Sequence, residues 1–189
     1  MPQTSVRVSS PSSSLRINRY LAVTLEIKNS IPLGTGSGLQ IVIPSDFKVD
    51  SQLTSVSARG GSSKTGLSFT KTTNTLGETV LTMTSVNEAY TEAQTYHYVT
   101  LNNLLIPPST KETRSFSVTL TEAVTNLAIE TLSTGITMKP LAGALVGVSV
   151  QPSSPYINQK GVTYKFRFTL EDPIMISRGT PIIKVTFPD

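Results

Sequence analysis

Apolar and polar residues alternate with a period of two over most of this chain. The clearest case is residues 20–28, where every second side chain is apolar: Leu21, Val23, Leu25 and Ile27. Successive side chains of a β-strand point to opposite faces of a sheet, so this pattern predicts a strand with one buried face. No segment shows the period of a long helix, and only residues 88–95 could form a short helical turn. We therefore expect an all-β protein.

Glycine, proline and asparagine divide the alternating segments into many short strands. This pattern is typical of two antiparallel sheets that bury their inner faces against each other. We predict an Ig-like antiparallel β-sandwich over residues 1 to about 140. Strands are expected near residues 6–8, 20–28, 39–43, 53–58, 67–71, 79–84, 96–101, 114–120, 127–129, 135–138, 145–150, 162–170 and 182–187. The predicted core consists of Leu21, Val23, Leu25, Ile27, Ile41, Ile43, Val80, Leu101, Phe116, Val118 and Leu120.

The same sequence landmarks recur in the same order about 140 residues apart, which indicates tandem repeats. Val6-Arg7-Val8 resembles Val148-Ser149-Val150, and a long alternating strand follows each of them, at residues 23–27 and 164–168. A glycine-containing loop comes next in both copies. Each copy then has a strand that ends in an apolar residue and a proline, Ile43-Pro44 or Phe187-Pro188. We therefore predict a complete repeat at 1–140 and the N-terminal part of a second repeat at 141–189.

The second copy supplies too few strands to bury its own apolar side chains. A sandwich needs both sheets to cover either one, and about three strands do not make an independent core. Another chain or repeat could complete it, the sequence could be a piece of a longer polyprotein, or these strands could join the first domain. We expect completion by another chain or repeat. The candidate assembly interface is Val148, Val150, Tyr164, Phe166, Phe168, Ile183, Val185 and Phe187.

These landmarks resemble those of large, repetitive surface and secreted proteins of ciliates and other protists, which carry tandem β-sandwich units. The shared motifs are a V-x-V-x-P opening, a long alternating strand, a Pro-Ile and Gly loop and a strand ending in Phe-Pro: residues 148–152, 164–170, 173–179 and 183–188. Residues 101–109 look like the asparagine-proline loop of such units, although no Asn precedes Pro107 and the cysteines of many such proteins are missing. The resemblance implies an extracellular, scaffold-like role and transfers no catalytic residue.

Few residues suggest a catalytic, metal-binding or phosphate-binding site. The chain has no cysteine, so it has neither a disulfide nor a thiolate nucleophile. His97 is the only histidine and lacks spaced partners for a triad or a metal site, so we expect a solvent-facing strand residue. Glu171-Asp172 offers fewer oxygens than Ca²⁺ needs, so we expect a solvated turn. The Gly-rich segments 34–38 and 60–65 lack a phosphate-loop signature. We predict a non-enzyme with no catalytic residue, metal or cofactor.

Composition points to a surface or secreted protein. Charged residues make up 15% of the chain, and roughly a quarter is Ser and Thr, well above average usage. The net charge is +4 with scattered basic residues, so nucleic acid is not an expected partner. No stretch approaches the ~20 apolar residues of a membrane span, and the N-terminus has no apolar signal segment. We predict an extracellular building block that assembles head to tail with copies of itself or neighbouring repeats into a fibre or surface coat. The alternative is an adhesive or carbohydrate-binding module.

Overall fold

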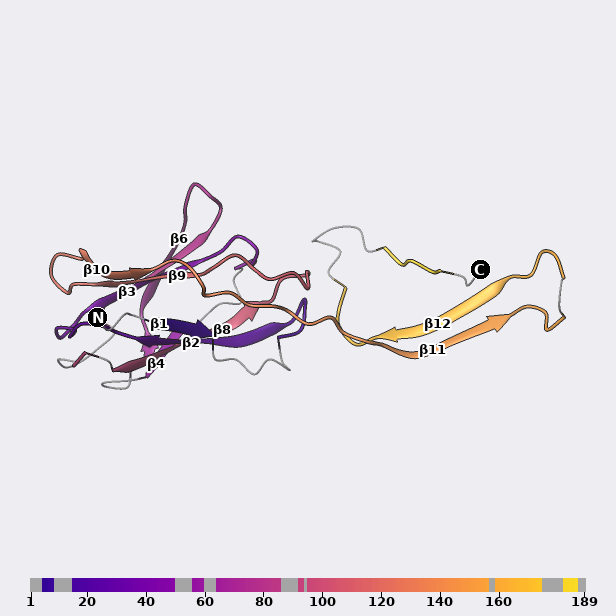
Figure 1. Ribbon diagram of the computed structural model, residues 1–189, viewed down its shortest axis with the longest axis horizontal. Helices are drawn as coiled ribbons and strands as arrows, with labels where there is room; N and C mark the ends of the chain where they lie inside the picture. The colour runs from indigo at the N-terminus through magenta and orange to yellow at the C-terminus, as the bar shows by residue number, and fades with distance from the viewer. Residues whose placement is uncertain are drawn as a thin grey trace.

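The computed structural model describes residues 5–8, 15–49, 56–59, 64–85, 92–93, 95–156, 159–174 and 182–186. Within these ranges the protein is all-β, as predicted, and none of the residues forms a helix that could cross a membrane. Two five-stranded sheets form a sandwich, and a separate two-stranded ribbon projects from one end of it (Figure 1). The short helical turn predicted at 88–95 falls largely outside the described residues.

Both sheets of the sandwich are antiparallel throughout. The first sheet has the order β1 (Ser5–Val8), β2 (Tyr20–Lys28), β8 (Tyr96–Leu105), β4 (Val56–Arg59) and β5 (Lys64–Leu67). The second has the order β10 (Ala128–Leu132), β9 (Ser117–Thr121), β3 (Gly38–Ile43), β7 (Thr79–Met83) and β6 (Phe69–Thr73). Because the chain passes repeatedly from one sheet to the other, strands far apart in sequence become neighbours. The fold is the predicted Ig-like antiparallel sandwich.

The core lies between the two sheets and contains most of the predicted residues. Val23, Leu25 and Ile27 of β2 are fully buried, as is Leu101 of the neighbouring β8, and the predicted residues of β3 and β9 are buried in the opposite sheet, together with Phe116. Leu21 is only partly buried at the edge of the core. Val80 is a correction, because it lies half-buried on the outer face while its neighbour Leu81 is fully buried opposite Ile41. Val80 and Leu81 are both apolar, so alternation alone did not decide which of them faces inward.

Three predicted strands have different structures. Residues 182–187 were predicted as a strand, but their described part, 182–186, forms none. Residues 67–71, predicted as one strand, are divided between the sheets, since β5 ends at Leu67 in the first sheet and β6 begins at Phe69 in the second. Residues 135–138 form no strand, yet Ile136 and Met138 are buried in the core. The carbonyl of Ile136 accepts a hydrogen bond from the N–H of Phe116 at 2.9 Å. This segment therefore closes the sandwich without joining a sheet.

Candidate assembly surface

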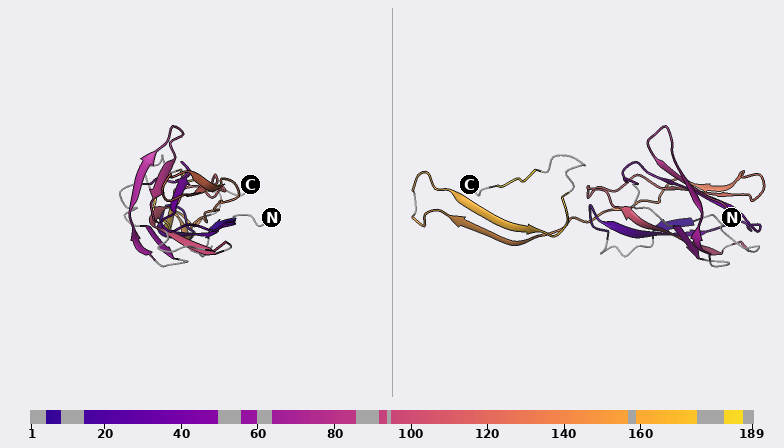
Figure 2. Two further views of the ribbon diagram at one scale, coloured as in Figure 1. Left: turned by 90° about the vertical axis from the view of Figure 1, so that its left-hand side faces the viewer. Right: turned by 180° about the vertical axis from the view of Figure 1, so that it is seen from behind.

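The ribbon consists of β11 (Leu145–Pro152) and β12 (Tyr164–Leu170), paired antiparallel. Neither strand joins a sheet of the sandwich (Figures 1 and 2). Residues directly opposite each other in an antiparallel pair share a face, so Val150 shares one with Phe166, and Leu145 with Leu170. The register shifts between Val146 and Ser149, where Gly147 has a φ of 64°, as in a β-bulge. One face is thereby apolar: Leu145, Val148, Val150, Tyr164, Phe166, Phe168 and Leu170.

Most of this apolar face is open to solvent. Phe168 is partly buried, and the exposed fraction of the other six residues runs from 38% for Phe166 to 59% for Val148. The opposite face is mostly polar and carries Val146, Ser149, Gln151, Lys165, Arg167 and Thr169. An amphipathic sheet of two strands has no core of its own, because a single hairpin buries little apolar area. The ribbon therefore has the chemistry of one inner sheet face of a sandwich.

The ribbon reproduces the first strand pair of the sandwich. β1 pairs antiparallel with β2 as β11 does with β12, and each pair begins with a V-x-V segment. The inward residues of β2 are Val23, Leu25 and Ile27, and all three are fully buried under the second sheet. Tyr164, Phe166 and Phe168 occupy the matching positions in β12, since Phe166 lies opposite Val150 as Leu25 lies opposite Val8. The other edge of β2 pairs with β8, whereas β12 is an edge strand in the described part of the chain.

The structure brings together only some of the sequence-predicted interface residues. Val148, Val150, Tyr164, Phe166 and Phe168 share the apolar face of the ribbon. Ile183 and Val185 lie in the segment 182–186, outside any sheet, and are 66% and 45% exposed. Phe187 lies outside the described residues. The sequence prediction missed Leu145 and Leu170. The alternation continued from Phe168 would have included Leu170, whereas continued from Val148 it leads to Val146, because the β-bulge shifts the faces of β11.

Charged side chains join the ribbon to the sandwich. Arg16 Nη1 lies 2.6 Å from Glu171 Oε2, and Arg19 Nε lies 2.7 Å from Asp172 Oδ1. Asp172 is 8% exposed, so the solvated turn predicted at Glu171-Asp172 is wrong. The pKa of Glu171 is lowered, first because the N–H of Ala144 donates to its carboxylate and then, against some desolvation that raises it, because Arg16 is close. Both carboxylates are therefore engaged with the sandwich or with the ribbon's own backbone.

His97 does not lie where the sequence predicted. It does face away from Tyr96 and Tyr98, but it points into the core opposite Ile27 and is only 6% exposed. Burial lowers the pKa of its imidazole, and within the described residues its Nε2 has no hydrogen-bond partner. The described residues contain no group of three or more His, Cys, Asp or Glu side chains that could hold a metal ion.

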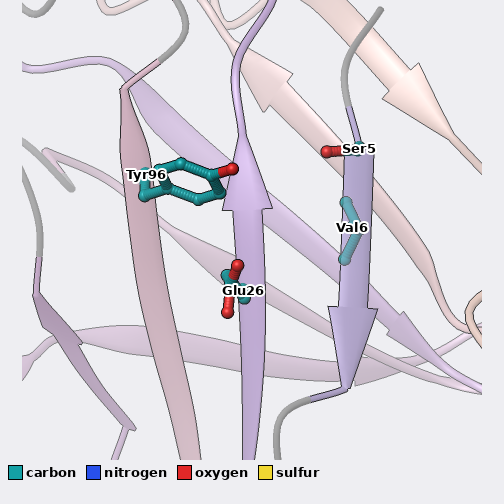
Figure 3. A pocket seen from close by; sticks show the side chains of 4 residues that line it. All are labelled: Ser5, Val6, Glu26 and Tyr96. Atoms are coloured by element: carbon teal, nitrogen blue, oxygen red, sulfur yellow. The ribbon is translucent and has the colours of Figure 1, made fainter.

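A shallow pocket lies on the outer side of the first sheet. It is lined by Ser5, Val6, Glu26 and Tyr96, which come from three neighbouring strands (Figure 3). Tyr96 is 44% exposed and stacks on Tyr98 with ring centroids 6.4 Å apart. The ammonium of Lys28 lies 5.3 Å from the centroid of the Tyr96 ring. The pocket thus combines an aromatic ring with a carboxylate and a hydroxyl.

Comparison with known proteins shows no relative by sequence. No family model matches the chain. No curated protein matches it either. Three solved structures are similar in shape at low sequence identity, and these likenesses carry no argument about function. One is AvmM, which catalyses macrocyclization in alchivemycin A biosynthesis, with a TM-score of 0.41, 7% identity, and coverage of 81% of this chain and 91% of that one.

Two further solved structures are also similar in shape. A non-cellulosomal cohesin from the hyperthermophilic archaeon Archaeoglobus fulgidus has a TM-score of 0.38 and 12% identity, and the match covers 75% of this chain and 93% of the cohesin. The collagen-binding domain of a Staphylococcus aureus adhesin has a TM-score of 0.33 and 9% identity, and the match covers 72% of this chain and 92% of that domain.

Proposed function

We propose that this protein is a non-enzymatic, extracellular structural module that assembles head to tail with modules of its own kind into a fibre or surface coat. The observation that carries the proposal is the exposed apolar face of the ribbon. Fully burying a Val, Leu or Phe side chain contributes about 1.5–3 kcal/mol relative to leaving it in water, so covering this face is strongly favourable. A soluble monomer rarely keeps such a contiguous apolar surface without a partner.

The partner that fits this face is a module of the same kind. In the sandwich, β8 lies along β2 with Leu101 opposite Val23 and Val99 opposite Leu25, and the second sheet covers the inner face. A module that supplied such a strand and sheet to the ribbon would bury Tyr164, Phe166 and Phe168 in the same manner. The contact joins different surfaces of the two modules, so it does not close on itself and extends into a filament.

The test is the mass of the full chain in solution as its concentration rises. By light scattering, the mass of the unaltered protein should increase with concentration. Phe166→Asp, which places a charge on the apolar face of the ribbon, should keep the protein monomeric. Arg167→Asp is the matched control, since it introduces the same charge one position along on the polar face and should leave association intact. A protein that stays monomeric at every concentration and binds no hydrophobic dye would overturn the proposal.

The pocket at Tyr96 supports a second candidate function, an adhesive module that binds neutral saccharides. Aromatic rings stack on the apolar faces of sugars, and the carboxylate of Glu26 and the hydroxyl of Ser5 provide hydrogen-bonding groups beside the ring. Calorimetric titration with neutral oligosaccharides should then show binding that Tyr96→Ala abolishes. Tyr156→Ala, at a residue 77% exposed in the segment between β11 and β12, is the control that should retain it. Absence of heat with every oligosaccharide would remove this candidate.

A further inference from the structure

The contact between the sandwich and the ribbon is built from one basic and one acidic segment. The basic segment, residues 15–19, contributes the side chains of Arg16, Asn18 and Arg19. The acidic segment follows β12 directly and consists of Glu171, Asp172 and Pro173. Besides the two ion pairs, Arg19 Nη2 donates to the carbonyl of Glu171 at 2.8 Å, and Asn18 Nδ2 donates to that of Pro173 at 3.1 Å. Side chains of the sandwich thus bind both the carboxylates and the backbone of this turn.

The basic segment is held firmly on the sandwich. The N–H of Asn18 donates to the carbonyl of Ile106 at 3.2 Å, and the N–H of Ile106 donates to that of Arg19 at 2.9 Å. On the other side, the N–H of Leu141 donates to the carbonyl of Leu15 at 2.8 Å. These bonds fix the segment between the end of β8 and the chain that leads into β11. The two arginines are therefore presented by an ordered backbone.

The acidic segment fits this surface by shape as well as by charge. Asp172 is buried, and its Oδ2 packs against the backbone of Gly143, where an added Cβ would lie 2.3 Å from that oxygen. Glu171 and Ala144 also exchange hydrogen bonds, since the N–H of each donates to an oxygen of the other. A longer side chain at position 172 or a larger residue at position 143 would not fit.

The corresponding end of β2 is chemically different. Phe166 lies opposite Val150 as Leu25 lies opposite Val8, so Phe168 matches Ile27. The positions that match Glu171-Asp172 are therefore occupied by Ser30-Ile31, which carries no carboxylate. The N–H of Ser30 instead donates to the carboxylate of Glu130 within the sandwich at 3.1 Å. Without carboxylates at these positions both ion pairs with Arg16 and Arg19 would be lost, so only the acidic strand end suits the basic segment.

We propose that the basic segment 15–19 is a docking surface that selects a module whose long strand ends in the pair Glu-Asp and holds that module in one orientation. The interaction fixes which module follows which, and it makes the junction stiff instead of a flexible tether. Intermodule contacts are mobile by default unless an interface restrains them, and here partly buried ion pairs and hydrogen bonds to the backbone provide the restraint. The inference does not depend on what covers the apolar face of the ribbon.

Distances between two spin labels test this inference in the full chain. Because the protein has no cysteine, Thr72→Cys on β6 and Gln151→Cys on β11 give two unique, exposed labelling sites on strands. At a concentration where the protein is monomeric, the pulsed electron paramagnetic resonance spectrum should show one narrow distance. Replacing Glu171-Asp172 with Ser-Ile, the pair at the matching positions after β2, should cause loss of that single distance, and so should Gly143→Ala.

Arg114→Ala is the matched control, because it removes an arginine whose ion pair with Asp46, at 3.5 Å, lies elsewhere on the sandwich. It should leave the narrow distance unchanged, and circular dichroism should show that every variant keeps its β-structure. A broad distribution in the unaltered protein would overturn the inference. A distance that stays narrow after the Ser-Ile replacement would overturn it as well. Because the measurement is made on monomers, neither result depends on whether the ribbon mediates assembly.

Discussion

At the scale of single residues, the buried His97 makes the stability of the sandwich depend on pH. Burial lowers the pKa of His97 from its ordinary value of 6.5, so the folded state keeps the imidazole neutral at a pH where the unfolded chain binds a proton. The unfolded state then binds more protons, and stability falls as pH falls below 6.5. At a pH one unit lower, the loss amounts to up to about 1.4 kcal/mol.

Chemical denaturation at pH about 7.5 and about 5.5 measures this effect in a window set by the histidine pKa. The pKa values of Glu122 and Glu171 are lowered from 4.5, so the stability these carboxylates contribute is lost only at more acidic pH. His97→Leu should abolish the difference between the two conditions, because the chain has no other histidine. Equal stability of the unaltered protein at both pH values would show that the imidazole is not held neutral in the core.

The same residue shows what alternation can and cannot predict. In Tyr96-His97-Tyr98 the pattern correctly places the histidine and the tyrosines on opposite faces, but it does not say which face is inside. Tyrosine has both an apolar ring and a polar hydroxyl, so it suits either face, and the tyrosines here lie outside. Val80 and Leu81 pose the same problem with two apolar neighbours. The sequence therefore predicts which residues of a strand share a face. Which of the two faces points into the core is decided by the strands that pack against it.

At the scale of elements, the long alternating strands were the most predictable. The sequence places strands at 145–150 and 162–170, and the structure has them at Leu145–Pro152 and Tyr164–Leu170. The change of sheet at Ser68 was not predictable, because a single polar residue interrupts an otherwise continuous strand pattern there. The contact between the sandwich and the ribbon was not predictable either. Arg19 and Asp172 are far apart in sequence, and only the folded arrangement brings them together.

At the scale of the whole molecule, the sandwich and the ribbon differ in how much they protect their backbone. β3, β7 and β9 lie inside a sheet and under a second layer, whereas β11 and β12 form a single layer with both faces toward solvent. Local opening costs least where few apolar contacts must break. The ribbon should therefore open far more readily than the sandwich in the monomer, although both are paired β-structure.

Amide hydrogen exchange on the intact protein measures this contrast. In dilute solution, amides of β11 and β12 should exchange much faster than those of β3, β7 and β9. At high concentration the ribbon should become protected, because an added strand and sheet would cover it, while protection of the sandwich should not change. Phe166→Asp should prevent the gain and Arg167→Asp should permit it. A ribbon as well protected as β3 in dilute solution would mean that its apolar face is already covered within one chain, and assembly through that face would lose its physical basis.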